Sequence, residues 1–516
     1  MFTLGEIATK RARLGASDEA VVFDGIRLTY GQLHERTSRL ANAMLALGIR
    51  PGDRVAMLAE NSHRYVEFLL AAAKAGIVAT PLNFRLTERE LLHMLIDSGA
   101  RAVFVGADFD AIGQVLRSEL PDDVFWISLE PGMQWALGYE NLVRNGDAGE
   151  VASIVREDDL AVLMYTGGTT GLPKGVMLSH RNLLSAFMSM VIQFGFTARD
   201  VTLMVLPMFH VAIWQVFCHL IVGARVVILR RPEVGSILRT LESEHCTSMN
   251  AVPTLYNWIV SDPSLAKHDL SAIRLLIYGG SPFPEEILRK CIAQFGPVFA
   301  QGYGLTEAAP TVCFLAPEDH VIEGPRSRLL ASAGREMTLT EVRIADAQGN
   351  AVPIGEAGEV LARGPNIMLG YWNNEAMTRE RLKDGWLRTG DIGRIDEEGY
   401  VFLLDRKADM IVTGGENVYP SEIEGVLYTH PAVHECLVAS APDSRWGERV
   451  QAAVVLKEGV QVSEDDLLRF CKEHFAGYKC PKRIEFWKSL PRSPVGKLLR
   501  KDVKKAFWGG QERRVN

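Results

Sequence analysis

The sequence predicts an α/β protein with a large N-terminal domain of doubly wound α/β subdomains, a β-rich subdomain and a small α+β C-terminal domain. Strand and helix patterns alternate through the first third of the chain, which is typical of parallel sheets covered by helices. From about residue 341, short strands are separated by Gly, Asn and Asp turns, and an α+β pattern returns after residue 410. The 516 residues suffice for several domains at roughly 150 residues each.

The expected elements of the first third follow one another in a regular order. Thr29 and Gln32 form a capping-box signature, and the apolar helix pattern after them ends at Gly48. A second box, Thr87 with Glu90, begins a helix that ends at Gly99. Around it we expect strands over 54–58, 78–82 and 101–105 and a helix over 65–75.

Later parts of the chain supply the β-rich and C-terminal elements. Strands are expected over 341–345, 358–363 and 400–404, then near 434–440 and 449–456, with helices over 421–428 and 464–475. The apolar run 201–229 is long enough to span a membrane but contains Pro207, His210, Gln215, His219 and Arg225. Such residues are costly in hydrocarbon, so we expect a buried core and no transmembrane segment.

Composition and charge exclude several classes of protein. Hydrophobic residues make up 47% and the net charge is −7, so neither a disordered chain nor a basic nucleic-acid binder is expected. Seven cysteines show no CxxC spacing, and the N-terminus lacks an apolar signal-peptide core, which favours reduced thiols in the cytoplasm. Residues 479–505 nevertheless carry ten basic and two acidic side chains, a local patch for polyanions.

The strongest local signal is the run Met164-Tyr-Thr-Gly-Gly-Thr-Thr-Gly-Leu-Pro-Lys-Gly175. Its glycines allow close backbone approach, its threonines offer hydroxyls and its lysine adds a point charge, which together suit a polyphosphate. It is not a Walker A loop, because Pro173 and Gly175 flank Lys174 where that loop has glycine and Ser/Thr.

Four further segments follow in order: Gly302-Tyr-Gly-Leu-Thr-Glu307, Leu387-Arg-Thr-Gly-Asp391, Asp405-Arg-Lys-Ala-Asp409 with Gly414-Gly-Glu-Asn-Val-Tyr-Pro420, and Pro491-Arg-Ser-Pro-Val-Gly-Lys497. With the glycine-rich loop, they resemble the ANL superfamily of adenylate-forming enzymes over nearly the whole chain. That superfamily includes acyl-CoA synthetases, adenylation domains and luciferases. The acyl-CoA synthetase branch implies an ATP- and acyl-binding domain over 1–404, a hinge at 405–409 and a mobile lid domain over 410–516.

The resemblance also implies a reaction and its residues. ATP and a carboxylic acid would form an acyl-adenylate, which CoA then attacks after the lid moves. The implied catalytic residues are Lys497, Glu307, Thr306 and His210, with Glu307 holding Mg²⁺. The implied ATP-binding residues are Thr166, Gly167, Gly168, Thr169, Thr170, Gly171, Lys174, Gly280, Ser281, Gln301, Gly302, Tyr303, Gly304, Asp391 and Arg406.

Acyl and CoA contacts are implied at two further sets of positions. The acyl set is His210, Val211, Trp214, Gly279, Gly302 and Ala308, and the CoA set is Arg85, Gly414, Gly415, Glu416 and Trp446. Trp214 would share a helical face with His210. A tryptophan here favours a medium- or long-chain fatty acid, with aryl or arylalkanoic acids next, and the uncharged segments argue against an amino acid. For Trp446, a place in the core stays an alternative.

Two departures from the family pattern and two alternative functions remain. Gly167 replaces a common serine, and Ala408 stands where relatives often carry Asp or Lys at the hinge, which shifts the expected pivot toward Asp405.

An enzyme that loads a carrier protein and a luciferase-like monooxygenase are the alternatives to a CoA ligase. The expected partners are a small acid, ATP and CoA, with no nucleic acid, and a homodimer is left open.

Overall fold

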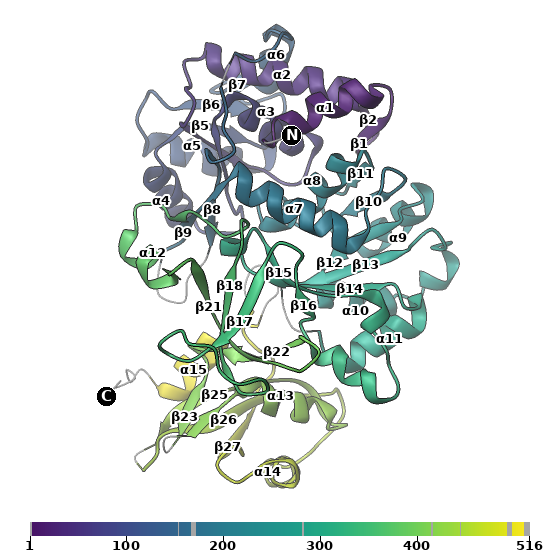
Figure 1. Ribbon diagram of the computed structural model, residues 1–516, viewed down its shortest axis with the longest axis vertical. Helices are drawn as coiled ribbons and strands as arrows, with labels where there is room; N and C mark the ends of the chain where they lie inside the picture. The colour runs from purple at the N-terminus through teal and green to yellow at the C-terminus, as the bar shows by residue number, and fades with distance from the viewer. Residues whose placement is uncertain are drawn as a thin grey trace. The chain divides into compact units, whose positions relative to one another are not determined.

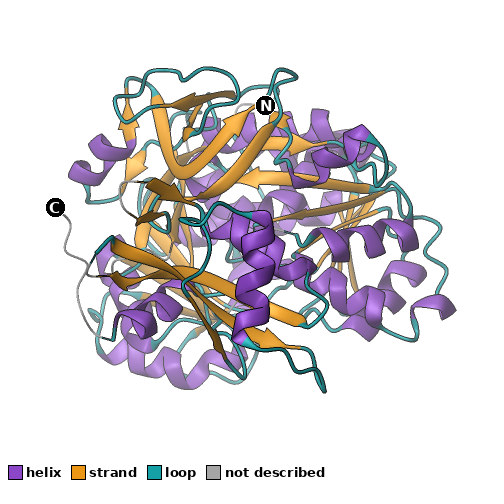
Figure 2. Cartoon of the chain, turned by 90° about the horizontal axis from the view of Figure 1, so that it is seen from below, coloured by secondary structure: helices purple, strands orange, loops and turns teal. Residues whose placement is uncertain are grey.

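The structure, a computed structural model, describes residues 3–152, 154–166, 172–280, 283–413, 416–443, 445–492 and 498–509. The chain divides into two compact units, one formed by Met1–Val342 and Ala362–Arg388 and the other by Arg343–Leu361 and Thr389–Asn516. Figure 2 shows helices and strands mixed throughout, as expected for α/β and α+β domains. The hinge expected at 405–409 stays a prediction.

The first unit contains a nine-stranded sheet in the order β16-β15-β14-β13-β12-β10-β11-β1-β2. Its central pairs, from β1–β11 through β13–β14, are parallel, and antiparallel pairs close both edges. The strands are β1 Glu19–Phe23, β2 Ile26–Thr29, β10 Val201–Met204, β11 Arg225–Ile228, β12 Ser248–Ala251, β13 Leu275–Gly279, β14 Phe299–Gly304, β15 Thr311–Leu315 and β16 Arg335–Glu336.

An eight-stranded sheet in the same unit has the order β19-β9-β8-β4-β3-β5-β6-β7. The pairs among β3, β4, β5, β6, β7 and β8 are parallel, whereas β9 pairs antiparallel with β8 and β19. The strands are β3 Arg54–Leu58, β4 Val78–Pro81, β5 Ala100–Val105, β6 Phe125–Ser128, β7 Leu137–Gly138, β8 Leu160–Thr166, β9 Lys174–Ser179 and β19 Gly370–Tyr371.

Helices connect most of these strands (Figure 1). They are α1 Glu6–Gly15, α2 Tyr30–Ala46, α3 His63–Ala75, α4 Glu88–Ser98, α5 Asp110–Ser118, α6 Tyr139–Asn145, α7 His180–Phe194, α8 Trp214–Val222, α9 Val234–Ser243, α10 Pro253–Ser261, α11 Glu285–Phe295 and α12 Glu375–Arg381. The 3-10 helices are η1 Ala107–Phe109, η2 Val211–Ile213, η3 Leu265–Lys267, η4 Thr306–Ala308, η5 Pro317–Asp319 and η6 Pro325–Ala331.

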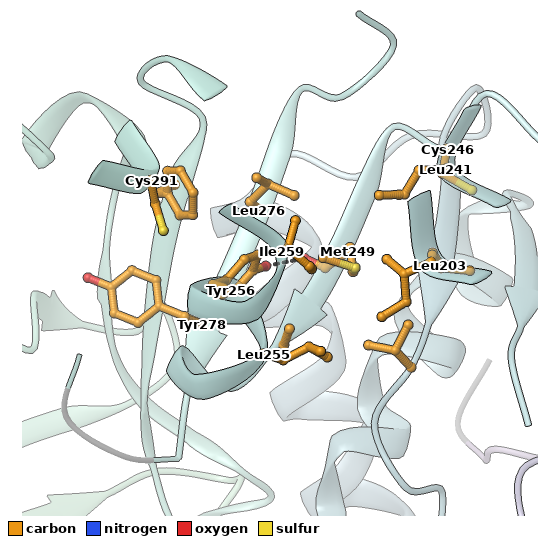
Figure 3. Packing of buried hydrophobic residues seen from close by; sticks show 14 of the residues in the cluster. Leu203, Leu241, Cys246, Met249, Leu255, Tyr256, Ile259, Leu276, Tyr278 and Cys291 are labelled. Carbon is orange, nitrogen blue, oxygen red and sulfur yellow. Dashed lines mark hydrogen bonds between the residues drawn. The ribbon is translucent and has the colours of Figure 1, made fainter. Parts of the chain in front are cut away.

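A core cluster packs the nine-stranded sheet against its helices and includes Tyr278 of β13 and Phe299 of β14. Tyr256 of α10 is fully buried and packs among apolar side chains of β12 and β13 (Figure 3). Its hydroxyl donates to the carbonyl oxygens of Met249 at 3.2 Å and Ile277 at 2.8 Å. Leu203 and Val227, from the apolar run 201–229, lie in this core, which confirms its assignment as buried.

The β-rich part forms a five-stranded sheet in the order β17-β18-β21-β20, with β22 paired to β21. Its strands are β17 Glu341–Ala345, β18 Gly358–Arg363, β20 Leu382–Lys383, β21 Trp386–Ile395 and β22 Val401–Arg406. The C-terminal sheet has the order β24-β23-β26-β25, with β27 parallel to β26. Its elements are β23 Ile411–Thr413, β24 Glu416–Val418, β25 Val433–Asp443, β26 Gly447–Leu456, β27 Arg483–Phe486, α13 Pro420–Thr429, α14 Glu464–His474 and α15 Arg500–Trp508.

The predicted fold class and elements are confirmed. Both capping boxes form with reciprocal hydrogen bonds, at Thr29 with Gln32 and at Thr87 with Glu90. The expected strands 341–345 and 358–363 match β17 and β18 in both bounds. All seven cysteines are unpaired and buried. Over the described part of the chain, no helix has the length and apolarity that crossing a membrane requires.

Candidate active site

The strands on either side of the glycine-rich run, β8 and β9, pair antiparallel. Thr166, the last residue of β8, pairs directly with Lys174, the first residue of β9. These two expected phosphate-binding residues therefore stand opposite one another. Residues 167–171, which include the other expected donors of the loop, lie outside the described residues.

The carboxyl ends of two neighbouring parallel strands bring together a second set of expected residues. Gly279 of β13 pairs with Gly302 of β14, and Tyr278 pairs with Gln301. The Tyr278 hydroxyl lies 3.3 Å from Oε1 of Gln301 and 3.0 Å from Nε2 of His320. This edge of a parallel sheet is where α/β proteins usually bind ligands. Gly280 follows with a φ of +75°, and Ser281 lies outside the described residues.

Two glycines at this edge differ in what the fold requires of them. A Cβ on Gly279 would collide with the carbonyl oxygen of Gly302, so packing demands a glycine there. A Cβ on Gly302 would meet nothing nearer than the Thr311 side chain at 3.6 Å, which is an ordinary contact. Since packing does not explain Gly302, its bare backbone is free to serve a bound ligand.

Glu307 lies in η4, directly after β14, and is held by a segment distant in the sequence. Its carbonyl oxygen accepts from the amide of Met368 at 2.9 Å, and its Oε1 accepts from the Tyr371 hydroxyl at 2.7 Å. Burial and the neighbouring carboxylate raise the pKa of Tyr371 well above its usual value, so the phenol stays protonated and donates. Thr306 beside it is buried, as is Tyr303 of β14.

Tyr371 was not among the residues predicted from the sequence. The run Gly370-Tyr371-Trp372 contains neither a metal-ligand pattern nor a phosphate-loop pattern. Its relevance comes from the pairing of β19 with β9, which places Tyr371 opposite Val176. A short strand of two residues gives almost no periodic signal, so only the structure reveals this contact.

The residues around Glu307 fit a Mg²⁺ ion bound together with a polyphosphate. Within the described part of the chain, no cationic side chain is paired with the Glu307 carboxylate. That part also contains no group of three or more His, Cys, Asp or Glu side chains able to hold a metal alone. Magnesium prefers one or two carboxylates together with phosphate oxygens and water, so a single glutamate suits a shared site.

The expected acyl-pocket segment differs from its prediction in one respect. His210 precedes η2 and accepts from the amide of Ile213 at 3.1 Å, whereas α8 begins only at Trp214. The two residues were expected to share a helical face, and that prediction is wrong because the intervening turn is 3-10, with three residues per turn. His210 is exposed, whereas Trp214 is buried and stacks on Phe194 with ring centroids 5.6 Å apart. Ala308 is fully buried, and the Val211 side chain lies outside the described residues.

Two expected ATP-binding residues are paired within the second unit: Asp391, which by resemblance binds the ribose, and Arg406, which by resemblance binds the ribose or a phosphate. Asp391 of β21 and Arg406 of β22 face each other across the strand pair, and Nε of Arg406 lies 3.1 Å from Oδ1 of Asp391. The Asp391 side chain is 12% exposed and that of Arg406 is 68% exposed. The mostly buried carboxylate can accept hydrogen bonds from the hydroxyl groups of a ligand, and the exposed guanidinium beside it offers the ligand a positive charge. Their roles as ATP ligands stay predictions.

The segment expected to be the hinge is tied to the C-terminal helices. One carboxylate oxygen of Asp405 accepts from the amide of Ser421 at 2.9 Å, and Arg500 lies 4.0 Å from the same oxygen. Arg500 also binds both carboxylate oxygens of the partly buried Glu424, at 2.9 and 3.1 Å. Burial raises the pKa of Asp405. Lys497 lies outside the described residues.

The residues expected to bind CoA are spread over both units. Arg85 lies over the rings of Phe84 at 5.6 Å and Phe209 at 5.9 Å, and burial lowers its pKa. Trp446 is 47% exposed, which argues against the alternative that it belongs to the core. Glu416 is exposed at the start of β24, and Gly414 and Gly415 lie outside the described residues.

Comparison with known families gives two matches that cover most of the chain. The model of the AMP-binding enzyme family matches residues 8–372, and the model of the AMP-binding enzyme C-terminal domain matches residues 422–497. The first match contains β8, β9, η4 and Tyr371. The second ends at Lys497.

Similar proteins of known activity align along their whole length. A feruloyl-CoA synthase of Amycolatopsis sp is 39% identical over 98% of this chain and 99% of its own. A fatty acid–[acyl-carrier-protein] ligase of Streptomyces coeruleorubidus is 37% identical, covering 100% and 98%. A long-chain-fatty-acid–CoA ligase of Mycobacterium tuberculosis is 35% identical, covering 98% and 99%.

A solved structure extends the likeness to three dimensions. The o-succinylbenzoate CoA synthetase of Bacillus subtilis, determined in complex with its acyl-adenylate intermediate, superposes with a TM-score of 0.85. It is 32% identical and covers 97% of this chain and 98% of its own.

Proposed function

Because the chain belongs to the family of AMP-binding enzymes, we propose that it ligates a carboxylic acid to coenzyme A with ATP. In the first step a carboxylate oxygen attacks the α-phosphorus, the bond to the β-phosphate bridging oxygen breaks, and pyrophosphate leaves. In the second step the CoA sulfur attacks the acyl carbonyl carbon, AMP leaves with the former carboxylate oxygen, and the thiol proton is released.

The observation that carries this proposal is the association of η4 with the β8–β9 strand pair in one unit. These two strands flank the glycine-rich run suited to a polyphosphate, and β9 contacts η4, which contains Glu307. The α-phosphate of ATP gains negative charge during attack, so a neutralised, oriented phosphate lowers the barrier. Carboxylate and phosphate ligands meeting at one place are what adenylate formation requires.

Each residue has a distinct part in this chemistry. Lys174, Thr166 and the loop amides would hold the phosphates, while Gln301 and Gly302 border the space for the adenylate. Glu307 would hold Mg²⁺, which supplies charge neutralisation at the phosphates when bound. Lys497 would bridge the acid and the α-phosphate in the first step only. Asp391 would bind the ribose, and Arg406 would contact the same ribose or a phosphate.

For the acid, we propose an apolar compound, with a medium- or long-chain fatty acid first. The segments expected to line the acyl site are 210–218, 279–284 and 302–310, and their one carboxylate is Glu307, which is assigned to Mg²⁺ and not to an amino group of the acid. The likeness to a long-chain-fatty-acid–CoA ligase supports a fatty acid. The likeness to a feruloyl-CoA synthase favours an aryl acid as the second candidate. Pyrophosphate release measured over a panel of both acid classes decides between them.

One alternative acceptor has specific support. The 37% identity to a fatty acid–[acyl-carrier-protein] ligase favours transfer to a carrier protein as the second candidate activity. Acid-dependent AMP formation that needs a carrier protein and gives no thioester with CoA would establish it. A luciferase-like monooxygenase would instead show light emission or oxygen uptake.

The activity test is direct. With ATP, CoA and an accepted acid, the protein should release AMP and pyrophosphate and form the acyl thioester in equal amounts. Production of ADP and phosphate would contradict the proposal.

The seven unpaired cysteines support a cytoplasmic location, where thiols stay reduced.

A further inference from the structure

The Tyr371 side chain has no part in the function described so far, although its hydroxyl contacts the expected magnesium ligand. The residue is 5% exposed, and its hydroxyl donates to Oε1 of Glu307 at 2.7 Å. The two residues are 64 positions apart in the sequence. A buried contact over such a distance requires that both backbones be held firmly.

The backbone of Tyr371 is anchored to the strand that leaves the glycine-rich loop. Gly370 and Tyr371 pair with Met177 and Val176 of β9. On the other side, the Tyr371 amide donates to the Thr378 hydroxyl at 2.8 Å. The ring therefore projects from a backbone whose position is set by β9 and α12, independently of its own hydroxyl.

The backbone of Glu307 is anchored to the same distant segment by bonds that do not involve Tyr371. The Met368 amide donates to the Glu307 carbonyl at 2.9 Å. The side-chain amide of Asn366, which is 1% exposed, donates to the carbonyl of Ala308 at 2.9 Å. These two bonds fix the backbone of η4. The Tyr371 hydroxyl is therefore not needed to hold the turn and serves to orient the Glu307 carboxylate.

The chemistry of the donor matters as much as its place. A neutral phenol occupies one lone pair of Oε1 without placing a positive charge beside the carboxylate. An arginine or lysine at this point would orient the carboxylate but neutralise it. Hydrogen-bond partners of this kind commonly orient metal ligands, and their loss typically weakens metal binding by about 10- to 100-fold.

We propose that Tyr371 is a positioning residue that orients the Glu307 carboxylate toward the Mg²⁺ of bound MgATP. This inference rests on the proposed role of Glu307 as a magnesium ligand. It also links the phosphate loop to the metal ligand, because β9 and η4 are joined through the segment that carries Tyr371.

The test compares Y371F with a matched control, Y139F. The Tyr139 hydroxyl also donates to a buried glutamate, Glu67, at 2.5 Å, but this pair lies on α6 and α3 and has no proposed part in catalysis. The measured quantity is the affinity of the full chain for Mn²⁺ in the presence of ATP. It is monitored through the electron paramagnetic resonance signal of the free ion. Y371F should bind Mn²⁺ about tenfold more weakly, while ATP binding without metal and the melting temperature stay near those of the wild type. Y139F should bind Mn²⁺ as the wild type does.

One further variant, E307Q, separates this proposal from the proposed function. If E307Q loses Mn²⁺ binding but Y371F keeps it within twofold, the role of Tyr371 is wrong and that of Glu307 stands. If E307Q itself keeps Mn²⁺ binding, the role of Glu307 is wrong and that of Tyr371 falls with it.

A double-mutant cycle provides the second measurement. E307D shortens the carboxylate and withdraws it from the hydroxyl, so Y371F in that background should cause no further loss of Mn²⁺ affinity. Additive losses would overturn the proposal, because they would mean that the two side chains act separately.

Discussion

At the scale of single residues, the site separates what the fold needs from what a ligand needs. Gly279 and Gly302 lie side by side, yet only Gly279 is required by packing. Glu307 is held by its backbone and oriented by a tyrosine that comes from another strand. Motif glycines in a sequence look alike, and only their surroundings show which of them leave room for a substrate.

A pair of alanine substitutions tests this distinction. G279A should lower the free energy of unfolding by about 1–3 kcal/mol, because its new methyl group overpacks the strand pair. G302A should keep the wild-type stability but weaken ATP or acid binding, because the methyl group enters the ligand space. Urea denaturation and nucleotide binding by calorimetry measure the two effects. A destabilised G302A with normal binding would contradict this interpretation.

Removing the charge of Glu307 tests the adenylation step. E307Q should slow acid-dependent pyrophosphate exchange by about 100-fold or more, since an electrostatic contact aimed at the reacting phosphate is lost. It should leave the melting temperature within a few degrees of the wild type, because the backbone bonds of η4 remain. Wild-type exchange by a folded E307Q would exclude Glu307 from the chemistry.

Lys497 makes a different prediction, because it would serve one half-reaction only. K497A should abolish pyrophosphate exchange while still forming the thioester from supplied acyl-adenylate and CoA. Both half-reactions are measured on the same preparation, which controls for folding. Equal loss of both would mean that the lysine supports the lid domain rather than adenylation.

At the scale of elements, local sequence signals predicted helices and strands of the first 105 residues and of the region after residue 341, but none between residues 106 and 340. The boxes at Thr29 and Thr87 begin helices where expected, because a side-chain oxygen there accepts from an otherwise unpaired amide. The expectation that His210 and Trp214 share a helical face was wrong, because a 3-10 turn precedes α8. The strand β19 was not predicted, because two residues show no period.

The cap of α4 offers a test of this local reasoning. T87A should lower the free energy of unfolding by about 1 kcal/mol, whereas T87S, which keeps the hydroxyl, should be nearly neutral. Chemical denaturation of both variants measures the difference. Equal stability of T87A and T87S would mean that the Thr87–Glu90 box adds nothing to the helix.

At the scale of the whole molecule, the first unit buries several histidines in neutral form. Burial lowers the pKa of His219, His180 and His320 to about 4 each, and that of His63 to about 3. In the unfolded chain these groups take up protons near pH 6.5, before the folded chain does. The stability they confer is therefore complete above pH 6.5 and is lost as the pH falls toward 4.

The burial of these histidines in neutral form predicts that the protein loses stability in acid. The free energy of unfolding should fall between pH 7 and pH 5, by about 2 kcal/mol for His219 alone. H219Q, which cannot be protonated, should show a correspondingly smaller dependence on pH. Equilibrium denaturation at the two pH values measures this, and an equal dependence in H219Q would mean that His219 is not the neutral buried group described.

The central claim for the whole molecule is that one acid oxygen attacks the α-phosphorus of ATP. A carboxylic acid labelled with ¹⁸O in both carboxylate oxygens tests it most directly, because the attacking oxygen must leave with AMP when CoA displaces it. Mass spectrometry of the products should find one ¹⁸O atom in each AMP and none in pyrophosphate. Label in inorganic phosphate, or AMP without label, would contradict the claim.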